Sequence, residues 1–180
     1  MGAAQKAFFA LTSLLVGLLV VGLLLPDHAH VERSLTIDAP PERVFPEVNG
    51  MRAFAAWSPW SRAAAESHFA FEGPAQGVGS RMTWQSEDPK VGRGSQEIVH
   101  SEPGRRVDTR LDFGNRQGGE AHFVLEPTAG GGTRLTWAFD ASFGWDLLGR
   151  YVGLFLDRLI GDEYARGLAQ LKQKLEAGTP

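Results

Sequence analysis

The N-terminal part of the chain is an uninterrupted apolar run. Residues 7–25 carry no charge and include eight leucines, three valines and two phenylalanines. About 20 apolar residues cross roughly 30 Å of hydrocarbon as a helix. At about −0.5 kcal/mol each, these thirteen side chains favour insertion by roughly 6 kcal/mol. The run therefore predicts one transmembrane helix, in an anchor and linker that cover residues 1–29.

A cleaved signal peptide is the alternative for this segment. Its apolar region would be about 7–15 residues long and would lead to a cleavage site of small residues. This run is longer, and Asp27 stands where a small residue is wanted, so an uncleaved anchor is favoured. Lys6 precedes the run, whereas Asp27 and Glu32 follow it, and positive residues favour the cytoplasmic side. We therefore expect the rest of the chain outside the cytoplasm.

Beyond the anchor, hydrophobic and polar positions alternate with a period of two. Residues 31–37 show this alternation, and further segments with the same period follow between residues 67 and 140. The period is that of a strand with one buried face. Turn-forming residues such as Pro103-Gly104 and the three glycines at 130–132 separate the segments. Because short connections favour antiparallel neighbours, we expect an antiparallel meander.

Three helices are expected beside the strands. Pro41 can begin a short helix, because the first helical position needs no N–H group, and a second short helix is predicted over residues 51–57. A long helix is expected after Gly144, with its apolar side laid on the sheet. Two sets of apolar residues at helical spacing define that side: Trp145, Leu148, Val152, Phe155 and Leu159, then Tyr164, Leu168, Leu171 and Leu175.

Three glycines in this long helix require an explanation. Gly149, Gly153 and Gly161 each destabilise a helix by about 1 kcal/mol relative to alanine. We expect close packing, or a bend near Gly161, to offset that cost. The first half of the helix is also apolar on a further side, at Leu147, Tyr151 and Leu154, and is therefore too apolar to face water.

Composition excludes several classes of function. The 180 residues carry a net charge of −3, which disfavours nucleic acid as a partner. The chain has no cysteine, so disulfides, thiolate metal sites and cysteine nucleophiles are excluded. No HExxH motif, P-loop or GxGxxG motif occurs. We therefore expect neither a metal site nor a cofactor.

Several local motifs resemble the polyketide cyclase/dehydrase-like group of bacterial proteins in the SRPBCC, or START-like, helix-grip superfamily. These motifs are Pro40-Pro41-Glu42-Arg43-Val44-Phe45, Trp57-Ser58-Pro59-Trp60, Gly77-Val78-Gly79 and the segment from Gly132 to Trp137. The resemblance implies an α+β helix-grip domain over residues 30–177. In that fold a curved antiparallel sheet of about seven strands surrounds a long C-terminal helix, with two short helices after the first strand. It also implies a cavity between sheet and helix.

Inward-facing positions give the candidate lining of that cavity, although core packing is the alternative for any one of them. Trp57 and Trp60 are candidates for a gate at its mouth or for packing at the end of the short helices. His100 shares its face with Ile98 and is a weak candidate for a general acid or base. The full candidate set is Trp57, Trp60, Trp84, Ile98, His100, Leu111, Phe113, Phe123, Trp137, Val152 and Phe155.

Three functions follow from this interpretation. The leading hypothesis is non-enzymatic: a domain tethered to a bacterial inner membrane, on its periplasmic side, that binds a lipid or another hydrophobic small molecule. The second is a cyclase or dehydratase in which His100 acts with a carboxylate or arginine of the cavity. The third is a protein-interaction module at the membrane that uses Tyr151 and Leu154. Without a convincing catalytic pair, the residues favour the first.

Overall fold

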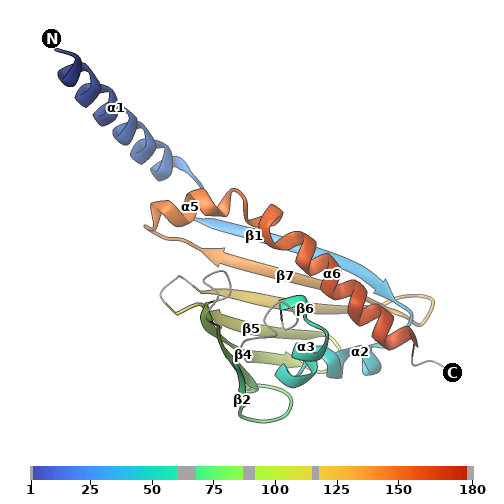
Figure 1. Ribbon diagram of the computed structural model, residues 1–180. Coiled ribbons are helices and arrows are strands. Elements are labelled where there is room, and N and C mark those ends of the chain that lie inside the picture. The colour runs from blue at the N-terminus through green and yellow to red at the C-terminus, as the bar shows by residue number, and fades with distance from the viewer. Residues whose placement is uncertain (1, 61–67, 87–91, 115–117, 178–180) are drawn as a thin grey trace.

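The N-terminal helix α1 (Ala3–Leu24) projects from the rest of the chain (Figure 1). In the computed structural model, residues 2–60, 68–86, 92–114 and 118–177 are described. The 22 residues of α1 extend about 33 Å at 1.5 Å per residue. The helix is therefore long and apolar enough to cross a membrane, as judged by length and composition. Its Thr12 hydroxyl donates a hydrogen bond to the carbonyl of Phe8 at 2.9 Å, so this polar group is satisfied within the helix.

The remainder of the chain is built on one seven-stranded sheet, as the sequence predicts. The strand order is β1-β7-β6-β5-β4-β3-β2, and every neighbouring pair is antiparallel. Strands β2 to β7 form a meander, and β1 pairs with β7 at the opposite edge. Their bounds are β1 (His28–Ile37), β2 (His68–Glu72), β3 (Arg81–Gln85), β4 (Arg93–Glu102), β5 (Arg106–Asp112), β6 (Gly119–Pro127) and β7 (Thr133–Ser142).

The pairing register brings one end of every strand to the same end of the sheet. Strands β1, β2, β4 and β6 begin there, whereas β3, β5 and β7 end there. At this end His28 of β1 pairs with Ser142 of β7, and Gln85 of β3 pairs with Arg93 of β4. Because β1 follows α1 directly, we call it the α1 end of the sheet.

The two faces of the sheet differ in chemistry. On the inner face, Val107 and Phe123 are buried in the core, and on the outer face Arg106 and Arg110 are exposed. The short helices α2 (Pro41–Val48) and α3 (Met51–Trp57) contribute Val44 and other apolar side chains to the same core. Both short helices lie where the sequence predicts them, after β1.

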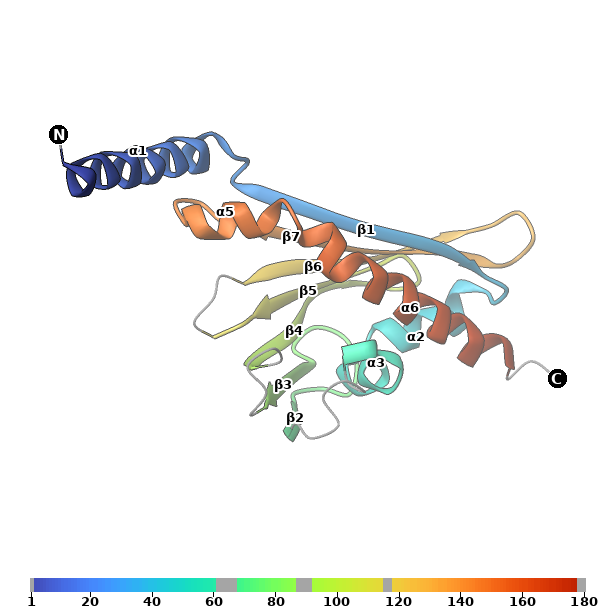
Figure 2. The same ribbon diagram turned by 45° about the horizontal axis from the view of Figure 1, so that its top comes forward.

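The C-terminal helical segment is interrupted. It consists of α5 (Leu147–Gly153) and α6 (Leu156–Ala177), and α6 runs along β1 (Figure 2). The break falls at Leu154 and Phe155 rather than near Gly161, which lies inside α6. The close packing expected at the other glycines is confirmed, since a Cβ at Gly149 or Gly153 would lie 2.8 or 2.5 Å from the Phe143 ring.

The two predicted apolar sets of this segment have different surroundings. Tyr164, Leu168, Leu171 and Leu175 of α6 are buried, as expected. The earlier set, from Trp145 to Leu159, is exposed, so the prediction that it packs on the sheet is wrong. The side of α5 that packs instead includes Leu147 and Tyr151, which contact Gly22 of α1. The neighbour of α5 is thus the N-terminal helix.

Candidate functional site

Aromatic rings fill the middle of the interface between the sheet and α6. The Trp137 ring of β7 stacks on Tyr164 of α6, with centroids 3.9 Å apart. Phe123 of β6 also stacks on Trp137, at 5.2 Å, and Trp57 of α3 meets Trp137 edge-on at 5.4 Å. We call these four residues and Phe54, which contacts three of them, the aromatic centre. This part of the expected cavity is occupied by the protein itself.

Several candidate lining residues therefore belong to the core. Trp57, Ile98, Phe123 and Trp137 are almost fully buried. Trp60 is partly exposed at the edge of the aromatic centre, with its ring 5.5 Å from Trp137. Burial also raises the pKa of the Tyr164 phenol above its ordinary value. For the four buried residues, packing is the role that the contacts support.

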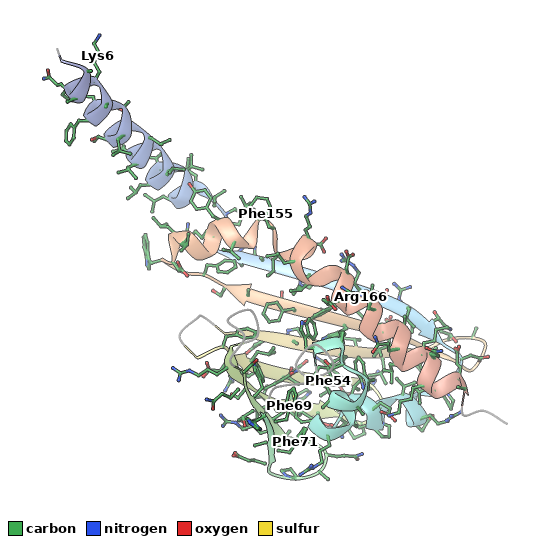
Figure 3. All side chains as sticks on the ribbon, viewed as in Figure 1. Lys6, Phe54, Phe69, Phe71, Phe155 and Arg166 are labelled. Carbon is green, nitrogen blue, oxygen red and sulfur yellow. The ribbon has the colours of Figure 1, made fainter. Side chains whose placement is uncertain are left out.

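The candidates at the α1 end have a different environment. Trp84 of β3, Leu111 of β5 and Phe113 just after β5 are only half-buried, and the Trp84 and Phe113 rings meet at 6.1 Å. Phe69 of β2 lies opposite Trp84 and is also half-buried. Figure 3 shows Phe69 near Phe71 in the part of the sheet far from α6. We call Phe69, Trp84, Leu111 and Phe113 the open aromatic end.

A hollow of about 440 Å³ lies on the outer face of β2 to β5, at the same end of the sheet as the open aromatic end. Its lining is largely polar and includes the charged residues Arg81, Arg93 and Asp112, although Phe69 and Trp84 also border it. Part of its floor is a row of small side chains, Ala70, Thr83 and Ser95, which are neighbours across three strands. The hollow is therefore separated by the sheet from the side chains of Trp84 and Leu111, which face the other way.

The prediction that His100 faces inward is wrong. The pairing of β4 with β5 shifts between Ile98 and His100, which is the signature of a β-bulge. One extra residue, Val99, turns the His100 side chain to the outer face, where it is exposed opposite Asp108. His100 therefore lies away from the aromatic centre and the core.

Val152 and Phe155 also lie elsewhere than expected. Both are exposed rather than turned to the sheet. Figure 3 shows Phe155 at the junction of α5 and α6, on the side away from the strands. Their expected position in the lining of the sheet–helix interface is therefore wrong.

An ionic network crosses the outer face of β1, β7, β6 and β5. His30 Nδ1 lies 2.7 Å from Asp140 Oδ1, and Asp140 Oδ2 lies 3.2 Å from His122 Nε2. His122 Nδ1 lies 2.9 Å from Asp108, which also accepts a hydrogen bond from Arg106. The hydrogen bond with Asp140 raises the pKa of His30. This network is not visible in the sequence, because only the strand register brings the polar positions of these strands into line.

Taken together, the curved antiparallel sheet, the paired short helices after β1 and the long C-terminal helix define a helix-grip fold. The sequence matches the family model "polyketide cyclase / dehydrase and lipid transport" over residues 28–176. The chain belongs to this family, within the SRPBCC superfamily, as its sequence motifs suggest. No protein among those with curated functions matches it significantly.

Solved structures share this fold at low sequence identity. The Zhui aromatase/cyclase from a Streptomyces species superposes with a TM-score of 0.63 at 14% identity, covering 85% of this chain and 99% of its own. Protein TTHA0849 from Thermus thermophilus superposes with a TM-score of 0.61 at 17% identity, covering 84% of this chain and 99% of its own. DynU16, a putative protein of the dynemicin biosynthetic locus, gives 0.56 at 21% identity, covering 86% of this chain and 49% of its own. These similarities describe the fold.

Proposed function

We propose that this protein is a membrane-tethered carrier or receptor that binds a lipid or another apolar small molecule at the open aromatic end. The observation that carries the proposal is positional. The half-buried residues Trp84, Leu111 and Phe113 lie at the α1 end of the sheet, where the chain joins its apolar helix. An apolar ligand concentrated in a bilayer would thus meet a part of the inner face of the sheet where apolar side chains are only half covered.

Contacts between α1 and the domain support retention of the helix as an anchor. The Tyr151 hydroxyl donates a hydrogen bond to the carbonyl of Leu18 at 2.6 Å. Gly22, the buried residue of α1, lies against Tyr151 and Leu147 of α5. A leader that is removed after export needs no fitted contact with the mature domain. We therefore favour an uncleaved anchor in a bacterial inner membrane, with the domain on the periplasmic side.

His100, the candidate acid or base of the enzymatic alternative, does not lie in the expected cavity. His100 is exposed on the outer face, and a general acid must come within hydrogen-bonding reach of the substrate. A ligand at the open aromatic end would lie across the sheet from it. Binding is therefore the function that the geometry supports best.

Photocrosslinking with a lipid tests the proposal on the full chain. The protein would be reconstituted in phosphatidylcholine vesicles that contain a phosphatidylcholine with a diazirine in its acyl chain. We expect adducts at Trp84, Leu111 or Phe113, because an acyl chain bound there would lie against these side chains. Adducts confined to α1 would contradict ligand binding by the domain.

A matched pair of variants on β5 sharpens the test. Leu111→Gln places a polar amide in the open aromatic end and should lower domain adducts several-fold. Arg110→Gln changes the neighbouring residue on the outer face, which is exposed, and should leave them unchanged. Equal labelling of the two variants would show that the adducts come from nonspecific contact.

A further inference from the structure

An exposed apolar surface lies on the segment that connects the sheet to α6. Among the described residues outside α1, eight large hydrophobic side chains are exposed, and six of them lie between residues 145 and 159. Trp145 is 85% exposed, Leu148 is 76% exposed and the other four are 45–59% exposed. We call these six the apolar ridge: Trp145, Leu148, Val152, Leu154, Phe155 and Leu159. Water-facing patches of this kind mark a contact surface.

The apolar ridge is held at a fixed place beside α1. Arg150 of α5 donates from Nη1 to the carbonyls of Leu23 and Leu25, both at 3.1 Å. It also donates from Nε to the carbonyl of Gly144 at 3.0 Å, in the turn that precedes α5. The last carbonyls of a helix have no partner within that helix, so one guanidinium satisfies the end of α1 and ties it to the start of the ridge.

The depth of this contact can be worked out along α1. Tyr151 hydrogen-bonds to Leu18, which lies six residues before the end of the helix at Leu24. Six residues correspond to about 9 Å along the helix axis. Helices that lie flat in a membrane interface bury their apolar side by about 5–10 Å. If α1 spans the bilayer up to Leu24, α5 therefore lies at interfacial depth.

We infer that the apolar ridge inserts into the lipid interface as a second membrane contact, next to the transmembrane helix. The inference rests on the proposed membrane anchor, and it adds an orientation to it. The occupant is lipid rather than a protein, because the ridge continues the apolar surface of α1 and is fixed to it at interfacial depth. Trp145 at the start of the ridge suits this location, since tryptophan is enriched at membrane–water boundaries.

Two attachments orient the domain, whereas a single helix would leave it free to swing. The ridge follows β7 directly, at the α1 end of the sheet. With α1 and the ridge both in the bilayer, the open aromatic end is turned towards the lipid. A ligand could then pass between membrane and domain over a short path.

Spin labelling suits the test, because the chain contains no cysteine. A nitroxide would be attached to Leu148→Cys or Phe155→Cys in the full chain, reconstituted in vesicles of phosphatidylcholine and phosphatidylglycerol. Gln173→Cys, on an exposed position near the far end of α6, is the matched control. Both ridge positions are exposed, so the label does not disturb the core. Collision rates with oxygen, which enriches in lipid, and with a water-soluble nickel chelate are then compared.

We expect the nickel collision rate at positions 148 and 155 to be several-fold lower than at 173, with a higher oxygen rate. A third label at Leu14→Cys reports on the anchor. If position 14 collides with the nickel chelate, the anchor fails, and this inference fails with it. If position 14 lies in lipid but 148 behaves like 173, the ridge inference alone is overturned. Protection of 148 from both reagents would mean that protein covers the ridge, which also overturns it.

Discussion

Replacing Trp137 with alanine tests whether the sheet–α6 interface is a packed core or an empty cavity. The Trp137 ring is almost fully buried and contacts Tyr164, Phe123 and Trp57. Replacing a buried tryptophan or phenylalanine with alanine usually costs about 3–5 kcal/mol, through lost burial and the cavity left behind. Three rigid rings surround the site and cannot close it. A large loss of stability is therefore expected.

The magnitude should fall near the lower end of that range. Trp137 Nε1 is buried without a hydrogen-bond partner among the described residues. The substitution breaks no hydrogen bond of the ring and removes this unsatisfied donor. Removing the buried, unpaired N–H group offsets about 1 kcal/mol of the loss in stability. We expect a loss of about 3 kcal/mol in the free energy of unfolding. In a domain of about 150 residues this lowers Tm by about 6–12 °C.

Urea unfolding of the full chain in detergent micelles, followed by circular dichroism, measures the effect. Trp145→Ala is the matched control, because the same substitution removes a side chain that is 85% exposed. We expect that control to change the free energy of unfolding by less than about 0.5 kcal/mol. A loss below about 1 kcal/mol for Trp137→Ala would refute the packed interface. It would mean instead that a cavity lies between the middle of the sheet and α6.

Three further predictions concern separate features. Asp140→Asn should lower the raised pKa of His30 towards 6.5, as measured by NMR titration of the ring. The stability that the His30–Asp140 pair adds is present below pH 6.5 and is lost as pH rises through the pKa of His30 in the folded protein. The control Asp108→Asn leaves Asp140 in place and should leave the pKa of His30 raised. Gly167→Ala should cost about 1–3 kcal/mol in urea unfolding, because its Cβ would lie 2.9 Å from Trp137 and 3.0 Å from Pro59. Gly161→Ala should leave the free energy of unfolding nearly unchanged, since its Cβ meets chiefly the far end of the flexible Arg33 side chain. An equal loss of stability in Gly167→Ala and Gly161→Ala would refute this difference between the two sites. Arg150→Gln should speed amide hydrogen exchange in α5 with no change in β6, and unchanged exchange in α5 would argue against its fixation to α1.

Much of the fold could be predicted from the chain, because its signals are local. The alternation of buried and exposed residues along β5 is visible at Val107 and Thr109, and it sets the inner face directly. Turn residues between successive strands, such as Gly104, favour a meander, and the observed order from β2 to β7 agrees. The α1 helix is likewise visible as an unbroken apolar run.

The site was harder to predict, because it depends on register and packing. One inserted residue, Val99, reverses the side of the sheet on which His100 lies, and the alternation before it carries no warning. Aromatic side chains at inward positions fit both the lining of a cavity and the filling of one. The distinction between Trp137, which is buried, and Trp84, which is half-buried, depends on how far α3 and α6 extend over the sheet.

The apolar ridge shows why a helical period alone does not identify the partner of a helix. Residues 145–159 repeat at intervals of three and four, which suits a protein core and a lipid surface equally well. The useful signal is that Leu147 and Tyr151 make another side of the same segment apolar. One sheet can cover one side of a helix, so the second side needs its own partner. Full burial of one large apolar side chain contributes roughly 1.5–3 kcal/mol. The six side chains of the apolar ridge are about half exposed or more, so together they lack several kcal/mol of this stabilisation. A bilayer adjoining α1 would supply it.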